Sequence, residues 1–126
     1  MSLRSPLGRV LGRGSAKNGT GHWWAQRVSA VALIPLTLWF VFSLLLLPNL
    51  DYETVRAWLA VPLSDVLAVL LVAVAAHHSY LGTSVVVEDY VHGTGAKIGG
   101  LLLLKFAHVL LGGVGVFAIL RIGFGS

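Results

Sequence analysis

Three histidines lie within long apolar stretches of the chain: His77, His78 and His108. An ionisable group inside a membrane-spanning stretch is costly, so it normally faces protein, water or a cofactor. The plainest interpretation of each is a histidine hydrogen-bonded to a neighbouring helix. The alternative is axial ligation of haem iron, for which a histidine on an inward-facing helix is the usual donor.

Helical spacing connects one of these histidines with an acid. Asp89 follows His78 by eleven positions, which in a helix is about three turns, about 16 Å along the axis and about 20° around it. Gly82 lies near the same stripe and leaves room for a flat macrocycle or a close neighbour. His77 points about 100° away, so we expect it to pack or hydrogen-bond. His108 has no assignment.

The segment Glu88–His92 concentrates two acids, a phenol and an imidazole at the end of an apolar stretch. A helix end that meets water would explain it, with Tyr90 among interfacial aromatic residues. Acids at a helix C-terminus oppose the macrodipole, however, which favours a further use. Tyr90 supplies a donor for a quinone carbonyl, and Asp89 and His92 are candidates for proton relay.

Two further cations need a partner or a route to water. Arg27 follows Trp23 and Trp24, a typical interfacial anchor. Arg27 either snorkels alone or uses its forked donors to hold a haem propionate or a quinone oxygen. Lys105 either snorkels, which would place the true start of the third span later than Ile98, or neutralises a buried anion.

Composition shows which elements must position these residues. Of the 126 residues, 56% are hydrophobic and only 11% charged, whereas soluble domains are about 25% charged. The chain has no cysteine, which excludes disulfides and thiolate metal sites. The net charge of +4 comes largely from basic residues before the first apolar stretch. An anionic membrane surface explains them better than nucleic acid does.

Apolar stretches at about 24–47, 64–87 and 98–121 are each close to the ~20 residues that cross a bilayer as a helix. Strict alternation of polar and apolar residues is absent, which excludes a barrel. We therefore predict an all-α membrane protein with a basic tail (residues 1–21) and a three-helix anchor domain (residues 22–126). Pro35 is expected to kink the first span mildly.

Flanking charges predict the direction of the spans. The tail carries basic residues and no acids, whereas the first connection holds Asp51 and Glu53. The positive-inside rule then places the N-terminus inside and the C-terminus outside, in a bacterial inner membrane or alternatively a mitochondrial one. The segment Tyr52–Leu59 is predicted to form a short amphipathic helix on the outer surface.

The stretch His78–His92 resembles the H-x-x-x-G…(E)DYVH signature of the smaller hydrophobic membrane anchor of succinate dehydrogenase (complex II). The stretch Gly21–Ala30 is similar to that family's W-x-Q-R-x-[ST]-A start. The resemblance covers nearly the whole chain from Gly19 onward.

That resemblance implies a complex in which a flavoprotein subunit oxidises succinate and an iron–sulfur subunit passes electrons on. A second anchor, the cytochrome b subunit, would pack with this chain into a helical bundle and share a b-type haem and a ubiquinone site. By the family pattern, His78 is an axial haem ligand, Arg27 lies near propionate and quinone, Tyr90 hydrogen-bonds the quinone and Asp89 assists. No activity is expected of the chain alone.

Three alternatives remain open at this stage. A fumarate reductase anchor would use similar parts in the opposite direction. A stand-alone cytochrome would need two axial histidines of its own, such as His78 with His108. A structural scaffold subunit would bind neither haem nor quinone.

Overall fold

The computed structural model describes residues 19–125 of the chain. Four helices follow one another there: α2 (Gly19–Leu46), α3 (Tyr52–Leu59), α4 (Pro62–Tyr90) and α5 (Thr94–Gly123). The three long helices are each apolar and long enough to cross a membrane. The prediction of an all-helical protein with three spans is confirmed. Most of the basic tail (residues 1–18, with Arg4, Arg9, Arg13 and Lys17) lies outside the described residues.

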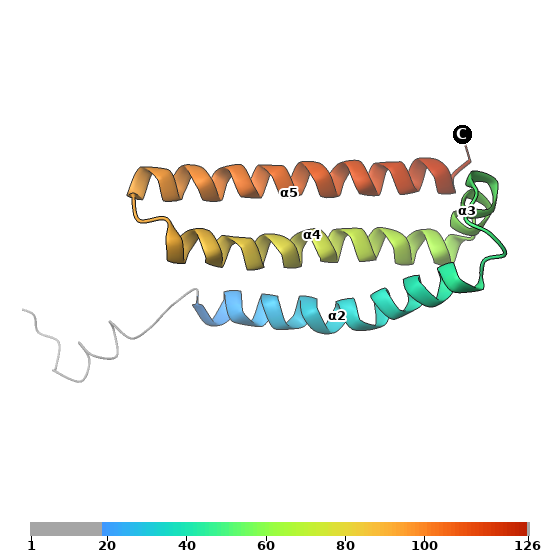
Figure 1. Ribbon diagram of the computed structural model, residues 1–126, viewed down its shortest axis with the longest axis horizontal. Coiled ribbons are helices and arrows are strands. Elements are labelled where there is room, and N and C mark those ends of the chain that lie inside the picture. Colours follow the sequence, from blue (N-terminus) through green and yellow to red (C-terminus); the bar gives the residue numbers. More distant parts are fainter. Residues whose placement is uncertain (1–18, 126) are drawn as a thin grey trace, which may run out of the picture.

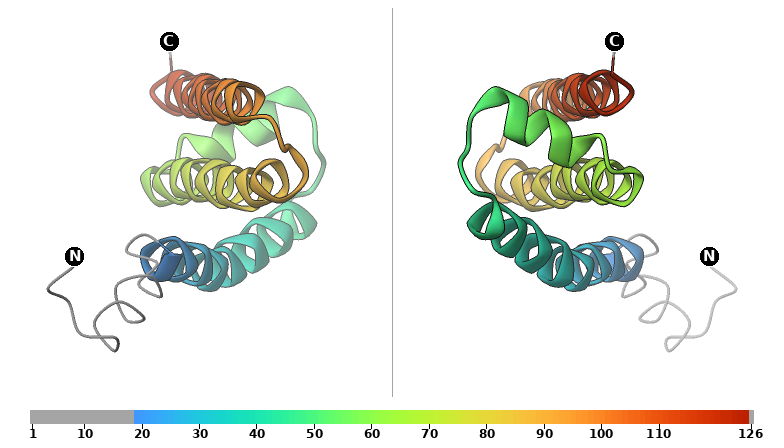
Figure 2. Two further views of the ribbon diagram at one scale, coloured as in Figure 1. Left: turned by 90° about the vertical axis from the view of Figure 1, so that its left-hand side faces the viewer. Right: turned by 90° about the vertical axis from the view of Figure 1, so that its right-hand side faces the viewer.

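The three long helices form one layer with α4 in the middle (Figure 1). Helices α2 and α5 run antiparallel to α4 on its two sides, and they do not contact each other. The short helix α3 lies across one end, against α4 and α5 (Figure 2). Such a layer buries little, and its buried apolar residues are Leu59, Ala68 and Leu81. The exposed apolar faces suit lipid or another membrane subunit.

Helix α4 continues beyond the apolar stretch that predicted it. It has 29 residues and ends at Tyr90, so Glu88 and Asp89 lie in its last turn and the connection to α5 is only Val91–Gly93. The apolar stretches at about 64–87 and 98–121 predict a longer connection. Hydropathy falls at Glu88, but the backbone hydrogen bonding of α4 continues beyond it. At 1.5 Å per residue α4 is about 43 Å long, against about 30 Å of hydrocarbon core, so its ends reach the headgroup region.

Pro35 lies inside α2, and Figure 1 shows this helix bending near its middle. A proline has no backbone N–H to donate, and its ring crowds the carbonyl four residues earlier. The bend therefore has a local cause, in agreement with the sequence-based expectation.

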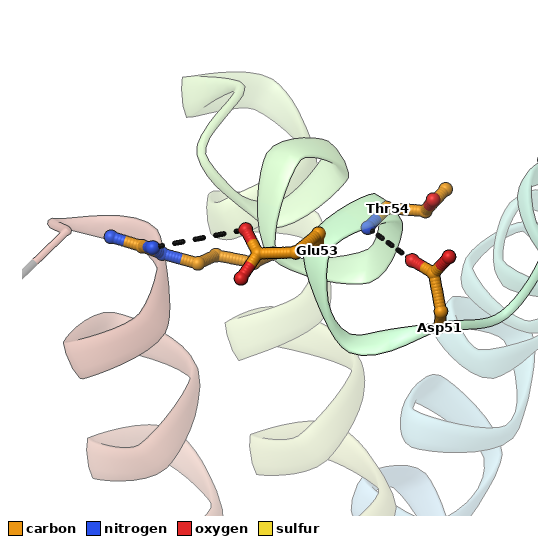
Figure 3. A network of polar contacts seen from close by, with 4 residues as sticks. Asp51, Glu53 and Thr54 are labelled. Atoms are coloured by element: carbon orange, nitrogen blue, oxygen red, sulfur yellow. Dashed lines mark hydrogen bonds and ion pairs between the residues drawn. The ribbon is translucent and has the colours of Figure 1, made fainter.

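The short helix α3 spans Tyr52–Leu59, as its sequence predicts. Asp51 caps it, accepting a hydrogen bond of 2.8 Å from the backbone N–H of Thr54 (Figure 3). This N–H is the main reason why the pKa of Asp51 lies below its usual value of 3.8. At the other side Trp58 stacks on Trp39 of α2, with ring centroids 5.5 Å apart. The cap and the stacked rings together fix the connection between the first two spans.

Glycines of α5 allow its close approach to α4. A Cβ added at Gly115 would lie 2.9 Å from Val72 Cγ1, and one at Gly112 would lie 3.1 Å from Ala76 Cβ. The contact at the far end is tighter still, because a Cβ at Gly123 would lie 2.5 Å from a carboxylate oxygen of Asp65. Small residues facing a neighbouring helix are the usual means of close helix packing in lipid.

Candidate functional site

His78 lies in the middle of α4 and contacts α2 through a serine. Its Nδ1 is 2.9 Å from Ser29 Oγ, and that hydroxyl also donates to the backbone carbonyl of Gln26 over 3.0 Å. Ser29 is 6% exposed. Among the described residues His78 Nε2 has no hydrogen-bond partner. The imidazole is therefore held through one nitrogen, and the other remains available.

A second serine–histidine pair joins the same two helices nearer the start of α2. His22 Nε2 lies 3.3 Å from Ser84 Oγ, and Ser84 donates to the carbonyl of Leu81 over 2.8 Å. Ser84 is 3% exposed. Here the histidine belongs to α2 and the serine to α4, the reverse of the first pair. Together the two pairs fix the antiparallel register of α2 on α4.

A cavity of about 470 Å³ opens beside the His22–Ser84 pair, lined by His22, Trp23, Gln26, Gly82 and Val85. A Cβ at Gly82 would only touch Gln26 Nε2 at 3.6 Å, so the room expected beside this glycine is bounded by that amide. Gln26 Oε1 is buried without a hydrogen-bond partner in the described part of the chain. A buried amide oxygen without a donor is costly, so we expect a donor from beyond the described residues to complete it.

Arg27 lies at the surface of α2. Its guanidinium carbon is 5.4 Å from the centroid of the Trp23 ring, within the range of a cation–π contact. The residues described here place no acid within ion-pairing distance of Arg27; the ion pair they contain joins Arg56 to Glu53 at 4.0 Å. The forked donors of Arg27 are therefore available to an anion beyond this chain.

Asp89 and Tyr90 form the exposed end of α4, at the same end of the layer as the start of α2. Tyr90 is 77% exposed. Neither side chain has a hydrogen-bond or ion-pair partner within residues 19–125. They lie about 16–18 Å along the helix axis from His78, so the structure does not bring them into contact with it. The carboxylate of Asp89 and the phenol of Tyr90 are therefore accessible from outside the helical layer.

The side of α4 that faces α5 differs from the side that faces α2. His108 Nδ1 donates to the carbonyl of Leu104 over 2.8 Å, and its Nε2 lies 3.1 Å from Ser79 Oγ. Both ring nitrogens of a neutral His108 are therefore occupied. His108 lies on α5 and contacts Ser79, whereas His78 contacts Ser29 of α2, so this chain does not direct the two rings at each other, and their pairing around one haem stays an untested alternative. Lys105, Tyr80 and the exposed His77 line a groove on this side.

Sequence reasoning missed Ser29, Ser84, Gln26 and the glycines of α5. Serines within otherwise apolar stretches were the available signal. The sequence does not show which helices are neighbours, so the histidine partner of each serine could not be predicted. Among residues 19–125 no cluster of three or more metal-ligating side chains occurs.

Comparison with known proteins places this geometry in context. Residues 1–117 match the family described as "Succinate dehydrogenase/Fumarate reductase transmembrane subunit". A succinate dehydrogenase hydrophobic membrane anchor subunit of Paracoccus denitrificans is 33% identical over 126 residues, which is 100% of this chain and 97% of the relative. Subunits with the same description from Rickettsia bellii and Rickettsia conorii are 32% and 35% identical, each over 71% of both chains.

Proposed function

The chain belongs to the succinate dehydrogenase/fumarate reductase family of transmembrane subunits as a hydrophobic membrane anchor, and from this premise we propose that it binds haem b and ubiquinone. Its partners in this proposal are a second anchor (the cytochrome b subunit), an iron–sulfur subunit and a flavoprotein subunit. The named relatives are succinate dehydrogenase anchors, which favours succinate oxidation over fumarate reduction. The proposed location is the bacterial inner membrane, with the N-terminus inside.

The observation that carries the haem proposal is the state of His78. A neutral imidazole whose Nδ1 is engaged offers Nε2 as a ligand, which is the arrangement that metal-binding histidines normally show. Bound there, a b-type haem would supply one-electron redox chemistry. A further ligand to the haem would come from the partner anchor, because both ring nitrogens of His108 are already hydrogen-bonded. This chain would thus supply one ligand atom to the haem, His78 Nε2.

Arg27 and Gln26 support the same site from α2. The guanidinium of Arg27 has its donors available and would neutralise a propionate or a quinone oxygen. Within residues 19–125 Gln26 Oε1 lacks a donor, and in this proposal a group of the partner anchor or of a bound molecule supplies it. Arg27 and Gln26 can take these roles because α2 lies beside α4, the helix that carries His78.

Tyr90 and Asp89 would act on the quinone at the exposed end of α4. In this proposal the phenol of Tyr90 donates a hydrogen bond to one quinone carbonyl, which favours the reduced oxygen as negative charge develops. Asp89 and His92 then move protons from the aqueous side to the two quinone oxygens. Reduction of a quinone to a quinol takes two electrons and two protons, so acids beside Tyr90 have a use that a plain helix end lacks.

The test is an optical difference spectrum of the complex purified in mild detergent, reduced first by succinate and then by dithionite. We expect a b-type band in the wild type and its loss in His78→Ala. The matched control is His77→Ala, which removes the neighbouring imidazole and should keep the band. A native band in His78→Ala would refute the ligand assignment, and no band in the wild type would favour a haem-free scaffold.

A further inference from the structure

Ser29 has one hydroxyl hydrogen and two polar neighbours. The carbonyl of Gln26, 3.0 Å away, can only accept, so the hydrogen of Ser29 is directed to it. His78 Nδ1 lies 2.9 Å from the same oxygen, and for this contact to be a hydrogen bond Nδ1 must carry the proton. A neutral imidazole protonated at Nδ1 has its lone pair at Nε2.

We propose that Ser29 is a positioning residue that holds His78 in the Nδ1–H tautomer and presents Nε2 to the haem iron. This inference rests on the proposed haem site and adds to it a residue on another helix. The backbone carbonyl of Gln26 fixes the hydroxyl, the hydroxyl fixes the ring, and the ring fixes the direction of the ligand atom. Because Ser29 is buried, water does not readily replace it.

The chemical consequence is electronic as well as geometric. A hydrogen bond from Nδ1–H to an oxygen raises the basicity of the other nitrogen, which stabilises ferric iron more than ferrous iron. Loss of the bond should therefore raise the midpoint potential of the haem and weaken its binding. Partners of this kind typically contribute about 10–100-fold in metal affinity.

A purely structural role must be separated from this one, because Ser29 also joins two helices. The Ser84–His22 pair provides the control, since it joins the same helices through the same kind of bond. Ser84→Ala removes an interhelical hydrogen bond but leaves the imidazole of His78 untouched. Ser29→Thr keeps a hydroxyl at the original position and tests rescue.

The experiment uses the whole complex with Ser29→Ala, Ser29→Cys, Ser29→Thr or Ser84→Ala. Redox titration followed at the b-type band gives the haem midpoint potential, and electron paramagnetic resonance of the ferric haem reports the orientation of its ligand rings. We expect a raised potential and changed g-values in Ser29→Ala, the same direction of change in Ser29→Cys, and native values in Ser29→Thr and Ser84→Ala.

Native potential and g-values in Ser29→Ala would overturn the inference. If Ser29→Ala does not assemble, Ser29→Cys decides, because a thiol fills the site and accepts hydrogen bonds only weakly. Equal changes in Ser29→Ala and Ser84→Ala would also overturn it, since helix register would then explain both. The haem site itself fails in a different way, through a native band in His78→Ala or no band in the wild type.

Discussion

Substitution of Gly115 by alanine tests whether α5 supports the helix that carries His78 and Tyr90. The added methyl carbon would lie 2.9 Å from Val72 Cγ1, whereas carbon atoms in contact are about 3.5–4.0 Å apart. Val72 is β-branched, and its χ1 has few alternatives in a helix. Relief therefore requires α4 and α5 to separate by several tenths of an ångström.

The expected magnitude follows from two opposing effects. Overpacking of this kind costs about 1–3 kcal/mol, while replacing a helical glycine by alanine gains about 0.5–1 kcal/mol. Gly113 offers a matched control, because a Cβ there meets nothing within 4 Å. The propensity gain is common to both variants, so Gly115→Ala should be about 1–3 kcal/mol less stable than Gly113→Ala.

The assay is thermal unfolding of the purified complex in one detergent, followed by the loss of its size-exclusion peak. We expect Gly113→Ala to match or exceed the wild type and Gly115→Ala to fall below it. Val72→Ala should partly rescue Gly115→Ala by removing the opposing methyl groups, a coupling that a double-mutant cycle measures. Equal midpoints for Gly115→Ala and Gly113→Ala, or no rescue, would refute the packing argument.

Two further predictions concern the ends of the layer. Tyr90→Phe should lower the rate of quinone reduction about tenfold, the equivalent of one hydrogen bond, with the haem retained. The control Tyr52→Phe, at an exposed tyrosine of the opposite end, should have no effect. Unchanged turnover in Tyr90→Phe would remove this residue from the site. The cap of α3 should depend on pH: because the pKa of Asp51 is lowered in the folded chain mainly by the backbone N–H of Thr54, its stabilising contribution is present above pH 3.8 and is lost as pH falls below this value. Fluorescence of Trp58 should report that loss in the wild type and not in Asp51→Ala, and a parallel response of both proteins would contradict it.

The three spans and α3 were predictable because each depends on a local pattern. Long apolar stretches and the amphipathic segment Tyr52–Leu59 specify helices without reference to the rest of the chain. The helix ends were less predictable, since Glu88–Tyr90 are polar yet continue the helical hydrogen bonding of α4. Hydropathy indicates which residues lie in lipid, whereas the end of a helix is set by where its backbone hydrogen bonds stop.

The contacts of the site were not predictable, because they depend on which helix lies beside which. The spacing of His78 from Asp89 follows from one helix, and the continuous α4 bears it out. The contact of His78 with Ser29 instead depends on α2 lying beside α4 at one particular register. The assignment of His108 likewise needed α5, since only its packing shows that Ser79 and Leu104 occupy both ring nitrogens.

The two sides of α4 serve different purposes, and the physics of lipid explains why. Lipid tails are as apolar as the helices, so burial of apolar surface does not choose the register of one span on another. Among the described residues, three serine–histidine contacts join α4 to its neighbours, and on the α5 side glycines add close approach. On the α5 side both ring nitrogens of His108 are hydrogen-bonded, so its contact with Ser79 serves helix packing. On the α2 side the imidazole of His78 keeps one nitrogen without a partner and Gln26 keeps one buried oxygen without a donor. Asp65 Oδ1, beside Gly123 of α5, is also buried without a hydrogen-bond partner among the described residues, so unsatisfied polar atoms alone do not distinguish the two sides. The unpartnered Nε2 of His78 does distinguish them, because it is a potential ligand atom in the middle of α4, and the α2 side is therefore where the partner anchor and the haem are expected.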